Sequence, residues 1–375
     1  MDQTTLQCGL QNTIFDNMAA NTTDSITYFP ATSVQDSEPS TSFWLHARSL
    51  AFRIGPPIIL SLGTAGNILI IIVLRRMGTE SSTMPLFFTA LAASDLALLY
   101  VGIFPVWLEN QFGFALTSTH SAVCKVNYWT FFSLGWLSSW LLVAMTIQRA
   151  MSVVWPHRVK QACTHQQAHA TIAILVTVLF GININLLFGV DISQELGRCF
   201  FTDSYLRQFL DVYIWIDLML SSILPFGLLL CSNSVLIWKV LQSVRAARAN
   251  LTGIQAEQVN ARQKKFSSMT VMLIVASGAF IILTGPINAV SLVTYFTEDT
   301  AAENDRTKSM PFLIALANLL WYTNSAVNFF LYMLTGSRFR QEFKKVFCTA
   351  GKPQAGCQRN LTDTFCQWSL SVYLV

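Results

Sequence analysis

Charged side chains are scarce in this 375-residue chain. Asp, Glu, Lys and Arg together make up 12% of the residues, whereas hydrophobic residues make up 53%. A water-soluble domain usually carries about 25% charged residues. A chain with so few charges cannot cover a folded surface with polar groups, so the composition predicts a membrane protein.

Several sequence patterns of other protein classes are also missing. The first residues, MDQTTLQCGLQNTIF, contain no basic stretch followed by an apolar core, so we expect no cleaved signal peptide. No CxxC or His-containing zinc pattern occurs. Cys163, His165 and His169 lie close together and could suggest a metal site, but a polar helix start gives the same spacing. Neither HExxH nor paired catalytic aspartates occur, and Lys308 precedes the last apolar run instead of lying within it. These absences argue against an intramembrane protease and a retinal protein. We expect the chain not to be an enzyme.

What the chain does contain is seven long apolar runs separated by short polar connectors. They cover roughly residues 52–74, 84–108, 122–147, 170–190, 206–240, 268–296 and 310–334. Inside a bilayer each run must satisfy its own backbone, which only a helix can do in a chain without alternating strands. We therefore predict an all-α membrane protein with a bundle of seven transmembrane helices.

The segment SRFRQEFKKVFC after the seventh run has a different pattern. Phe339, Phe343 and Phe347 recur every four residues, with Arg and Lys between them. This spacing predicts a short amphipathic eighth helix on the inner membrane surface, in contact with lipid. Cys348 at its end is either a palmitoylation site or an unmodified thiol.

The distribution of basic residues predicts the orientation of the bundle. If the amino terminus is outside, only seven of the 24 Lys and Arg residues are external: Arg48, Arg53, Lys125, Arg198, Arg207, Arg306 and Lys308. The other 17 face the cytoplasm, as the positive-inside rule requires. We expect a multi-pass plasma-membrane protein with an external amino terminus and a cytoplasmic tail. Asn21 then begins an external Asn-Thr-Thr glycosylation sequon.

Two carboxylates, Asp95 and Asp217, lie inside apolar runs, where an ionisable group is costly. Other polar residues lie at a depth similar to that of Asp95: Asn67, Ser138, Asn324, Ser325 and Asn328. The group has two interpretations. Its oxygen atoms can bind a small cation such as sodium, or the side chains can form a hydrogen-bonded network that holds the helices together.

The third run begins near Cys124, carries no charge from Val126 to Ile147, and is followed by Arg149 and Pro156. This spacing resembles the third helix of rhodopsin-like (class A) G protein-coupled receptors. Further matching motifs are Gly66-Asn67, Leu91-Ala92-Ala93-Ser94-Asp95, Pro225, Phe280 with Pro286, and Asn328 with Tyr332. Within that family, SSWLLVAMTIQR and NSAVNFFLYMLTGSRFRQEF look similar to invertebrate FMRFamide-type neuropeptide receptors.

The resemblance implies roles for particular residues. Asp95 and its polar neighbours would form the sodium site, and Cys124 would form a disulfide with Cys199. Arg149 would meet a heterotrimeric G protein, with Pro156, Tyr332, Lys264 and Lys265 at the same surface, the last two in a short basic connector over residues 241–267. Gln148 departs from the family, which usually has an acid there, and Thr284 stands where a tryptophan is usual.

The sequence divides into four segments. We expect a disordered extracellular tail over residues 1–50, a seven-transmembrane receptor domain over 51–335, the amphipathic helix over 336–348 and a cytoplasmic tail over 349–375.

The expected external surface is acidic and indicates the charge of the ligand. Fourteen of the 20 acids fall on it, against seven bases, and such a surface attracts cations, although acidic tails also serve solubility. Phe131 stands where receptors for amines carry an aspartate, which argues against a small amine. An extracellular peptide with a cationic, amidated end fits better, with Asp217 or Glu109 pairing with its arginine. Alternatively, hydroxyl groups of Ser or Tyr satisfy Asp217.

The candidate ligand-binding residues lie toward the outer ends of the runs. They are Glu109, Tyr128, Phe131, Phe132, Asp217, Asn318 and Tyr322, and Trp215 is a further candidate for the same aromatic pocket. The main alternative function is a transporter or channel with Asp95 and Asp217 in an ion path, although no internal repeat supports it. We expect no nucleic-acid partner.

Overall fold

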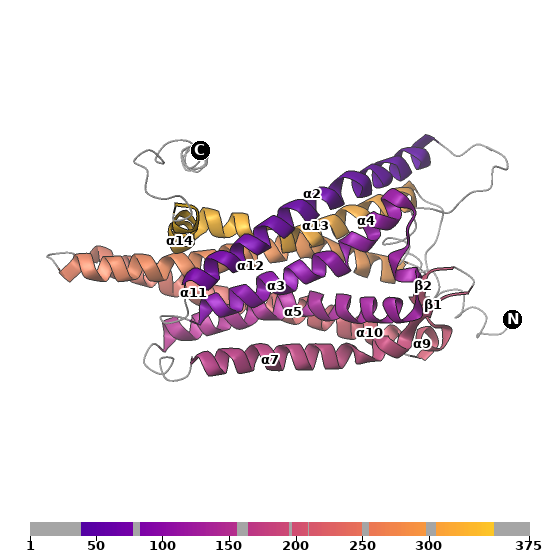
Figure 1. The fold of residues 1–375 in the computed structure, drawn as a ribbon. Helices are drawn as coiled ribbons and strands as arrows, with labels where there is room; N and C mark the ends of the chain where they lie inside the picture. Colours follow the sequence, from indigo (N-terminus) through magenta and orange to yellow (C-terminus); the bar gives the residue numbers. More distant parts are fainter. Residues whose placement is uncertain are drawn as a thin grey trace.

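The computed structural model describes residues 39–77, 83–155, 164–194, 197–208, 210–249, 255–297 and 305–348. Within these ranges seven helices are long and apolar enough to cross a membrane: 43–77, 84–112, 121–154, 165–189, 212–239, 270–293 and 309–335. They form one bundle, shown in Figure 1. The predicted seven-helix membrane fold is confirmed.

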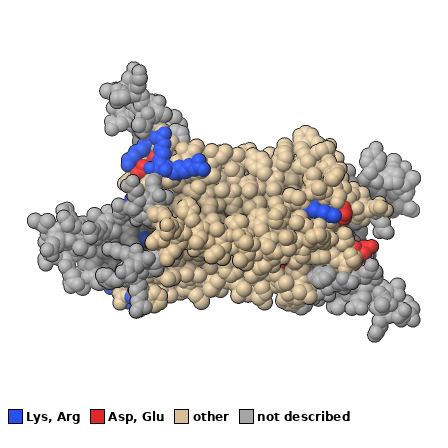
Figure 2. Space-filling view, turned by 60° about the horizontal axis from the view of Figure 1, so that its bottom comes forward, with Lys and Arg blue, Asp and Glu red and all other residues tan. Residues whose placement is uncertain are grey.

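The surface of the bundle has the charge distribution of a membrane protein. In the view of Figure 2, the middle of the molecule is an uncharged belt, and Lys, Arg, Asp and Glu gather at its two ends. Large apolar side chains are exposed along the belt, for example Ile58, Leu62 and Ile174. Such a surface is stable against lipid rather than water.

The first helix is longer than the sequence indicated. α2 runs from Pro39 to Met77, so residues 39–50, which we assigned to the tail, are helical. The extension packs against α13 (Asp305–Thr335) through a contact between the rings of Trp44 and Phe312, whose centroids lie 5.5 Å apart. Packing between the two helices thus continues the helix through a segment whose composition alone suggested a mobile tail. Residues 1–38 of the predicted tail and 349–375 lie outside the described residues.

The second span is divided at Gly102 into α3 (Met84–Val101) and α4 (Ile103–Phe112). Pro105 has no N–H to donate to the carbonyl of Val101, four residues earlier. Asn127 of the next span supplies the missing donor, with its Nδ2 2.8 Å from that carbonyl oxygen. A side chain at Gly102 would lie 2.7 Å from the ring of Tyr322, so only glycine allows this close approach.

α5 (Ser121–Val154) is the central helix of the bundle. It contacts α3, α7 (His165–Ile182) and α11 (Leu224–Ala249) along its length, and Figure 1 shows it in the middle of the molecule. Trp136, Leu141 and Met145 on this helix are almost completely buried. The helix that carries the Cys124, Arg149 motif therefore positions residues at both ends of the bundle.

A short hairpin covers one end. After α7 come η2 (Asn183–Asn185) and α8 (Leu186–Gly189), followed by β1 (Val190–Ile192) and β2 (Cys199–Phe201). The strands are antiparallel, with Val190 opposite Phe201 and Ile192 opposite Cys199. β2 leads through α9 (Asp203–Gln208) into the fifth span.

The fifth span is not a uniform α-helix. α10 (Leu210–Leu218) passes into a π-helical turn, η3 (Met219–Ile223), before α11 begins. Pro225 cannot donate to the carbonyl of Ser221, and a wider turn accommodates that loss. A π-helical turn contains one residue more than an α-helical turn. Because each residue of an α-helix turns the chain by about 100°, the extra residue rotates α10 by about 100° relative to α11. The turn therefore decides which way Asp217 points.

The remaining helices are α12 (Gln255–Thr297), α13 and α14 (Ser337–Cys348). α11 and α12 extend through most of residues 241–267, which we expected to be a connector. Each residue added to an existing helix forms a further backbone hydrogen bond without the cost of a new nucleus. α14 is the predicted amphipathic helix. Its Phe339 and Phe343 rings pack against Phe329, and Arg340 donates hydrogen bonds to the last carbonyls of α13.

Candidate functional site

The bundle contains a cavity of about 260 Å³ at the end covered by the hairpin. It is bounded by α3 and α4, α5, β2, the junction of α10 and η3, α12 and α13. All seven predicted ligand-binding residues line it: Glu109, Tyr128, Phe131, Phe132, Asp217, Asn318 and Tyr322. A largely apolar hollow with a few polar groups is the usual form of a ligand pocket.

A disulfide ties the hairpin to α5 beside this cavity. Cys124 and Cys199 are bonded, with their Cα atoms 5.5 Å apart, as the resemblance implied. The backbone N–H of Cys199 also donates to the hydroxyl of Ser118 at 3.0 Å. Because Cys199 itself lines the cavity, the bridge fixes the position of the pocket's cover.

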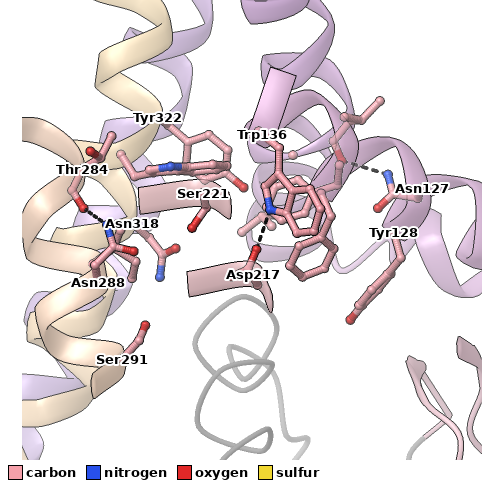
Figure 3. Close-up of a pocket in the computed structure, with 18 of the residues that line it drawn as sticks. Asn127, Tyr128, Trp136, Asp217, Ser221, Thr284, Asn288, Ser291, Asn318 and Tyr322 are labelled. Carbon is pink, nitrogen blue, oxygen red and sulfur yellow. Dashed lines mark hydrogen bonds between the residues drawn. The ribbon is translucent and has the colours of Figure 1, made fainter. Parts of the chain in front are cut away.

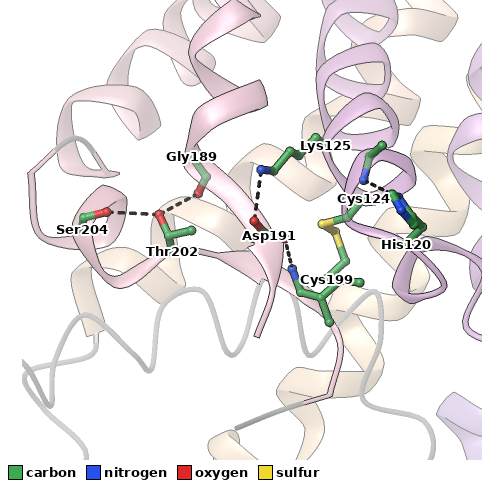
Figure 4. Close-up of polar contacts among 10 residues, drawn as sticks. His120, Cys124, Lys125, Gly189, Asp191, Cys199, Thr202 and Ser204 are labelled. Carbon is green, nitrogen blue, oxygen red and sulfur yellow. Dashed lines mark hydrogen bonds and ion pairs between the residues drawn. A yellow bond between two sulfur atoms is a disulfide. The ribbon is translucent and has the colours of Figure 1, made fainter. Parts of the chain in front are cut away.

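An ion pair between the first turns of α5 and the hairpin strand β1 holds the same hairpin, as Figure 4 shows. Lys125 Nζ lies 3.0 Å from Asp191 Oδ2. The pKa of Asp191 is lowered to about 2 by hydrogen bonds from the Ser121 hydroxyl, the Ile192 N–H and Lys125, the first being the largest cause. The carboxylate is therefore ionised at neutral pH and attracts Lys125.

Asp217 has one hydrogen-bond donor among the described residues, the indole of Trp136. The Nε1–H of Trp136 donates to Asp217 Oδ1 at 2.6 Å (Figure 3). We considered a Ser or Tyr hydroxyl as the alternative partner of Asp217. The hydroxyl of the nearby Tyr213 donates to Asn183 Oδ1 instead. Asp217 also lines the cavity, so one side of its carboxylate faces the space where a ligand would lie. The sequence feature that could have predicted this contact is the indole N–H of Trp136 within an apolar run, because a buried Trp N–H normally requires a hydrogen-bond partner.

Aromatic rings form much of the cavity wall. Phe131 lies 5.3 Å from Phe132 and 5.5 Å from Trp321, centroid to centroid, and Tyr128 lies 5.5 Å from Phe201. Trp321 and Phe201 were missed by the sequence analysis. Trp215, in contrast, is 41% exposed and does not line the cavity, so its assignment to the pocket is wrong. It lies on the outer face of α10, because Asp217 takes the inner one.

Neutral polar side chains occupy the part of the wall that α12 and α13 form. Thr284, Asn288 and Ser291 come from α12, and Asn318 comes from α13 (Figure 3). Figure 3 shows Asn288 and Ser291 on the side of the cavity away from Tyr128. Thr284 donates to the carbonyl of Phe280 in its own helix and is buried. In the part of the chain that the structure describes, no Lys, Arg or His lines the cavity.

A second polar cluster lies deeper in the bundle, around the fully buried Asp95. Ser138 Oγ donates to Asp95 Oδ1 at 2.9 Å, and Asn328 Nδ2 donates to Oδ2 at 2.8 Å. Asn67 Nδ2 donates to the backbone carbonyl of Ser325 at 2.8 Å, and its Oδ1 is buried with no hydrogen-bond partner among the described residues.

The structure thus brings together five of the six predicted network residues through side chains or backbone: Asp95, Ser138, Asn328, Asn67 and Ser325. Asn324 makes no hydrogen bond to Asp95 in the part of the chain described. Hydroxyl, carboxylate and orphan amide oxygens suit a small hard cation, so the donor set fits the sodium ion that the resemblance implied.

The opposite end of α5 carries Arg149. This side chain is 7% exposed, and its Nε donates to Thr270 Oγ1 of α12 at 3.1 Å. The neighbouring Gln148 donates to Thr83 Oγ1 at 2.8 Å, and its own Oε1 is buried without a partner. The polar contact between α5 and α12 is therefore made by a hydroxyl rather than by an acid.

The structure describes only some of the other residues predicted for G-protein contact or modification. Tyr332 is buried, and its ring packs against Phe88 and Phe339. Lys264 and Lys265 lie in α12, and Cys348 is the last residue of α14, but their side chains are not described. Pro156 and Asn21 lie outside the described residues.

Seven membrane-length helices around a pocket that a disulfide-linked hairpin covers define a membrane receptor of the seven-helix type. The profile of the rhodopsin family of 7 transmembrane receptors matches residues 66–332, and the chain belongs to this family. It is accordingly a multi-pass plasma-membrane receptor and not an enzyme. The alternative of a transporter or channel is not favoured.

Individual relatives narrow the comparison. The chain is 24% identical to the galanin receptor type 2 of Homo sapiens over 293 residues, 77% of this chain and 70% of that receptor. It is 23% identical to the thyrotropin-releasing hormone receptor of Mus musculus over 79% of this chain and 78% of that receptor. It is 24% identical to the neuromedin-U receptor 2 of Rattus norvegicus over 80% of this chain and 75% of that receptor. The narrower likeness to invertebrate FMRFamide-type receptors stays a prediction.

Proposed function

We propose that the chain is a G protein-coupled receptor for an extracellular neuropeptide with a cationic, amidated end. One observation supports a positively charged ligand: among the described residues, the cavity lining includes two acids, Glu109 and Asp217, and no Lys, Arg or His. The similarity to receptors named for galanin, thyrotropin-releasing hormone and neuromedin U supports a peptide ligand.

Asp217 is the better candidate for pairing with the cation. Its Oδ1 accepts from the neutral Trp136 N–H, which supplies no positive charge. An arginine of the ligand can approach the cavity side of the carboxylate and form two parallel hydrogen bonds with it. Phe131 and Tyr322 line the same space and would contact an adjacent ring of the ligand.

Transmission to the G protein would run through α5. We assign the disulfide end of the bundle to the outside and the Arg149 end to the cytoplasm, in line with the basic residues of the sequence. Ligand binding would favour a state in which α11 and α12 separate from α5, and Arg149 would leave Thr270 and meet the G protein. Lys264, Lys265, Pro156 and Tyr332 would contribute to the same surface, and a sodium ion at Asp95 would favour the closed state.

Modifications would act outside the helical bundle. We assign a glycan to Asn21 in the external tail and a palmitoyl group to Cys348 at the end of α14, where it would anchor the amphipathic helix to lipid.

A peptide-library screen tests the proposal, on cells that express the receptor with a promiscuous G protein. The potency of an activating peptide is then compared on wild type, Asp217→Asn and Glu109→Gln. Loss of a desolvated charge pair costs on the order of 2–5 kcal/mol, so potency should fall well over tenfold. The peptide with citrulline in place of arginine should show the same loss on wild type, and no further loss on the sensitive variant.

Asp203→Asn is the matched control for net charge. Asp203 is an exposed acid at the start of α9 and does not line the cavity, so its removal should leave potency within a few-fold of wild type. Normal responses of both cavity variants, or a best agonist without positive charge, would disprove the pairing.

A further inference from the structure

Two asparagines in the neutral part of the cavity wall have hydrogen-bonding capacity that their own helices do not use. Asn288 Nδ2 donates to the carbonyl of Thr284 at 2.8 Å, and Asn318 Nδ2 donates to the carbonyl of Ile314 at 3.0 Å. Both side chains are half-buried and line the cavity. They come from adjacent helices, α12 and α13, which pack against each other.

These contacts fix the orientation of both side-chain amides. The atom that lies next to a backbone carbonyl oxygen must be the nitrogen, because two oxygens there would repel each other. The amide oxygen is consequently the atom left over, together with the second N–H of each NH₂ group. Asn288 and Asn318 therefore offer two hydrogen-bond acceptors and two donors to the cavity.

A primary carboxamide matches this set better than other neutral groups. Its nitrogen carries two N–H donors, one for each Asn oxygen, and its carbonyl accepts from an Asn N–H. A secondary amide within a peptide chain has one N–H and can satisfy only one of the two oxygens. A carboxylate has no donor at all, would leave both oxygens unpaired, and would face Asp217 and Glu109 without any basic residue in the lining.

We propose that Asn288 and Asn318 bind the terminal carboxamide of the inserted ligand, and that the cavity thereby selects amidated peptides over the corresponding free acids. The inference rests on the proposed function and adds to it the residues that recognise the terminal group of the ligand. Asp217 binds the cation from one wall of the cavity, and the asparagine pair binds the neutral terminus from another.

The test uses two synthetic tetrapeptide libraries with arginine fixed at the third position, one ending in carboxamide and one in carboxylate. Both are applied to cells that express the full chain with a promiscuous G protein, and surface expression is measured on the same cells. The readout is the ratio of potencies of the two libraries, which does not depend on the number of receptors. We expect wild type to favour the amidated library by about tenfold or more.

Replacement of the asparagines should remove this preference. Asn288→Leu and Asn318→Leu keep the side-chain size and should bring the potency ratio to within about threefold of one. Asn288→Ser and Asn318→Ser give the same test if a leucine variant does not reach the surface. Asn110→Leu is the control, because Asn110 donates to the carbonyl of Val106 in the same way but does not line the cavity. It should retain the wild-type ratio.

The outcomes separate the inference from the function on which it rests. Equal potency of the two libraries on wild type, or an unchanged ratio in all four asparagine variants, overturns the carboxamide site and leaves the peptide receptor intact. Silence of both libraries on receptor that is present at the surface overturns the proposed cationic peptide ligand, and the carboxamide site with it.

Discussion

The indole N–H of Trp136 on α5 donates a 2.6 Å hydrogen bond to Asp217 on α10. The contact joins the central helix to the fifth span at the floor of the cavity, where Trp136 is 1% exposed and Asp217 faces the space. It allows a carboxylate to lie within an apolar bundle while one side of the carboxylate remains open to a ligand.

We expect Trp136→Phe to destabilise the receptor, because the phenyl ring fills most of the volume but leaves the carboxylate without its donor. A hydrogen bond to a charged group contributes about 1.5–3 kcal/mol, so the thermal unfolding temperature of purified receptor should fall. Trp140→Phe is the control, since Trp140 Nε1 donates to the neutral carbonyl of Leu220 at 2.8 Å in the same helix pair. Its effect should be smaller.

A double variant gives the decisive comparison. Trp136→Phe combined with Asp217→Leu removes both partners, so it should recover most of the stability lost in Trp136→Phe. Equal stability of wild type and Trp136→Phe would mean that water around the cavity already solvates Asp217.

Cys124→Ala should abolish surface expression or the ligand response. The bridge to Cys199 closes a loop with a sequence separation of 75 residues and holds the hairpin over the pocket. Loss of a native disulfide typically costs about 2–5 kcal/mol. Flow cytometry of tagged receptor and an agonist response measure the two effects. The controls are Cys231→Ala, at a free cysteine of α11, and Cys8→Ala, in the expected external tail, and both should behave as wild type. Normal signalling of Cys124→Ala would rule out the role of the bridge.

The receptor should signal measurably without ligand, and Gln148→Glu should reduce this basal activity. Arg149 is held across the helices by the hydroxyl of Thr270, and a charged acceptor beside it would be roughly twice as strong as a neutral one. The Thr83 hydroxyl, which now accepts from Gln148, can rotate to donate to the new carboxylate. Nucleotide exchange on the G protein, measured without agonist, gives the basal rate.

Thr270→Val should raise that basal rate, because it removes the hydroxyl that accepts from Arg149 Nε and keeps the side-chain shape. Ser152→Ala is the control, since the Ser152 hydroxyl bonds only to the Gln148 carbonyl within the same helix. A silent wild type and a silent Thr270→Val would show that contacts other than this one hold the closed state.

The Lys125–Asp191 pair should make stability depend on acid pH. The pKa of Asp191 is lowered from 3.8 to about 2 in the folded receptor, so the paired carboxylate stabilises the fold above the unfolded pKa. That contribution is lost as the pH falls from about 4 to about 2. Asp191→Asn should therefore unfold at a lower temperature than wild type from pH 7 to pH 5, and the difference should shrink below about pH 4. An unchanged difference at pH 3 would contradict the assignment.

Local sequence was sufficient for the membrane class and the seven helices. Long uncharged runs have no stable conformation in lipid other than a helix, so their number and approximate limits are readable from composition. The pocket residues, such as Tyr128 and Tyr322, were found because a family resemblance supplied the depth of each residue along its helix. We predicted that the first helix begins near residue 51, whereas it begins at Pro39. Its first turns are stabilised by the contact of Trp44 with Phe312 and not by apolar composition.

Tertiary structure alone decided which side chains meet. The partner of Asp217 is Trp136 because the π-helical turn before Pro225 rotates α10 by about one residue relative to a regular helix. The carbonyl freed by Pro105 is satisfied by Asn127 from another helix. Asn67 points to the backbone of Ser325 instead of to Asp95. Helical periodicity fixes the residues that share a face, but the rotation and tilt of each helix, set by packing over the whole bundle, determine what that face contacts.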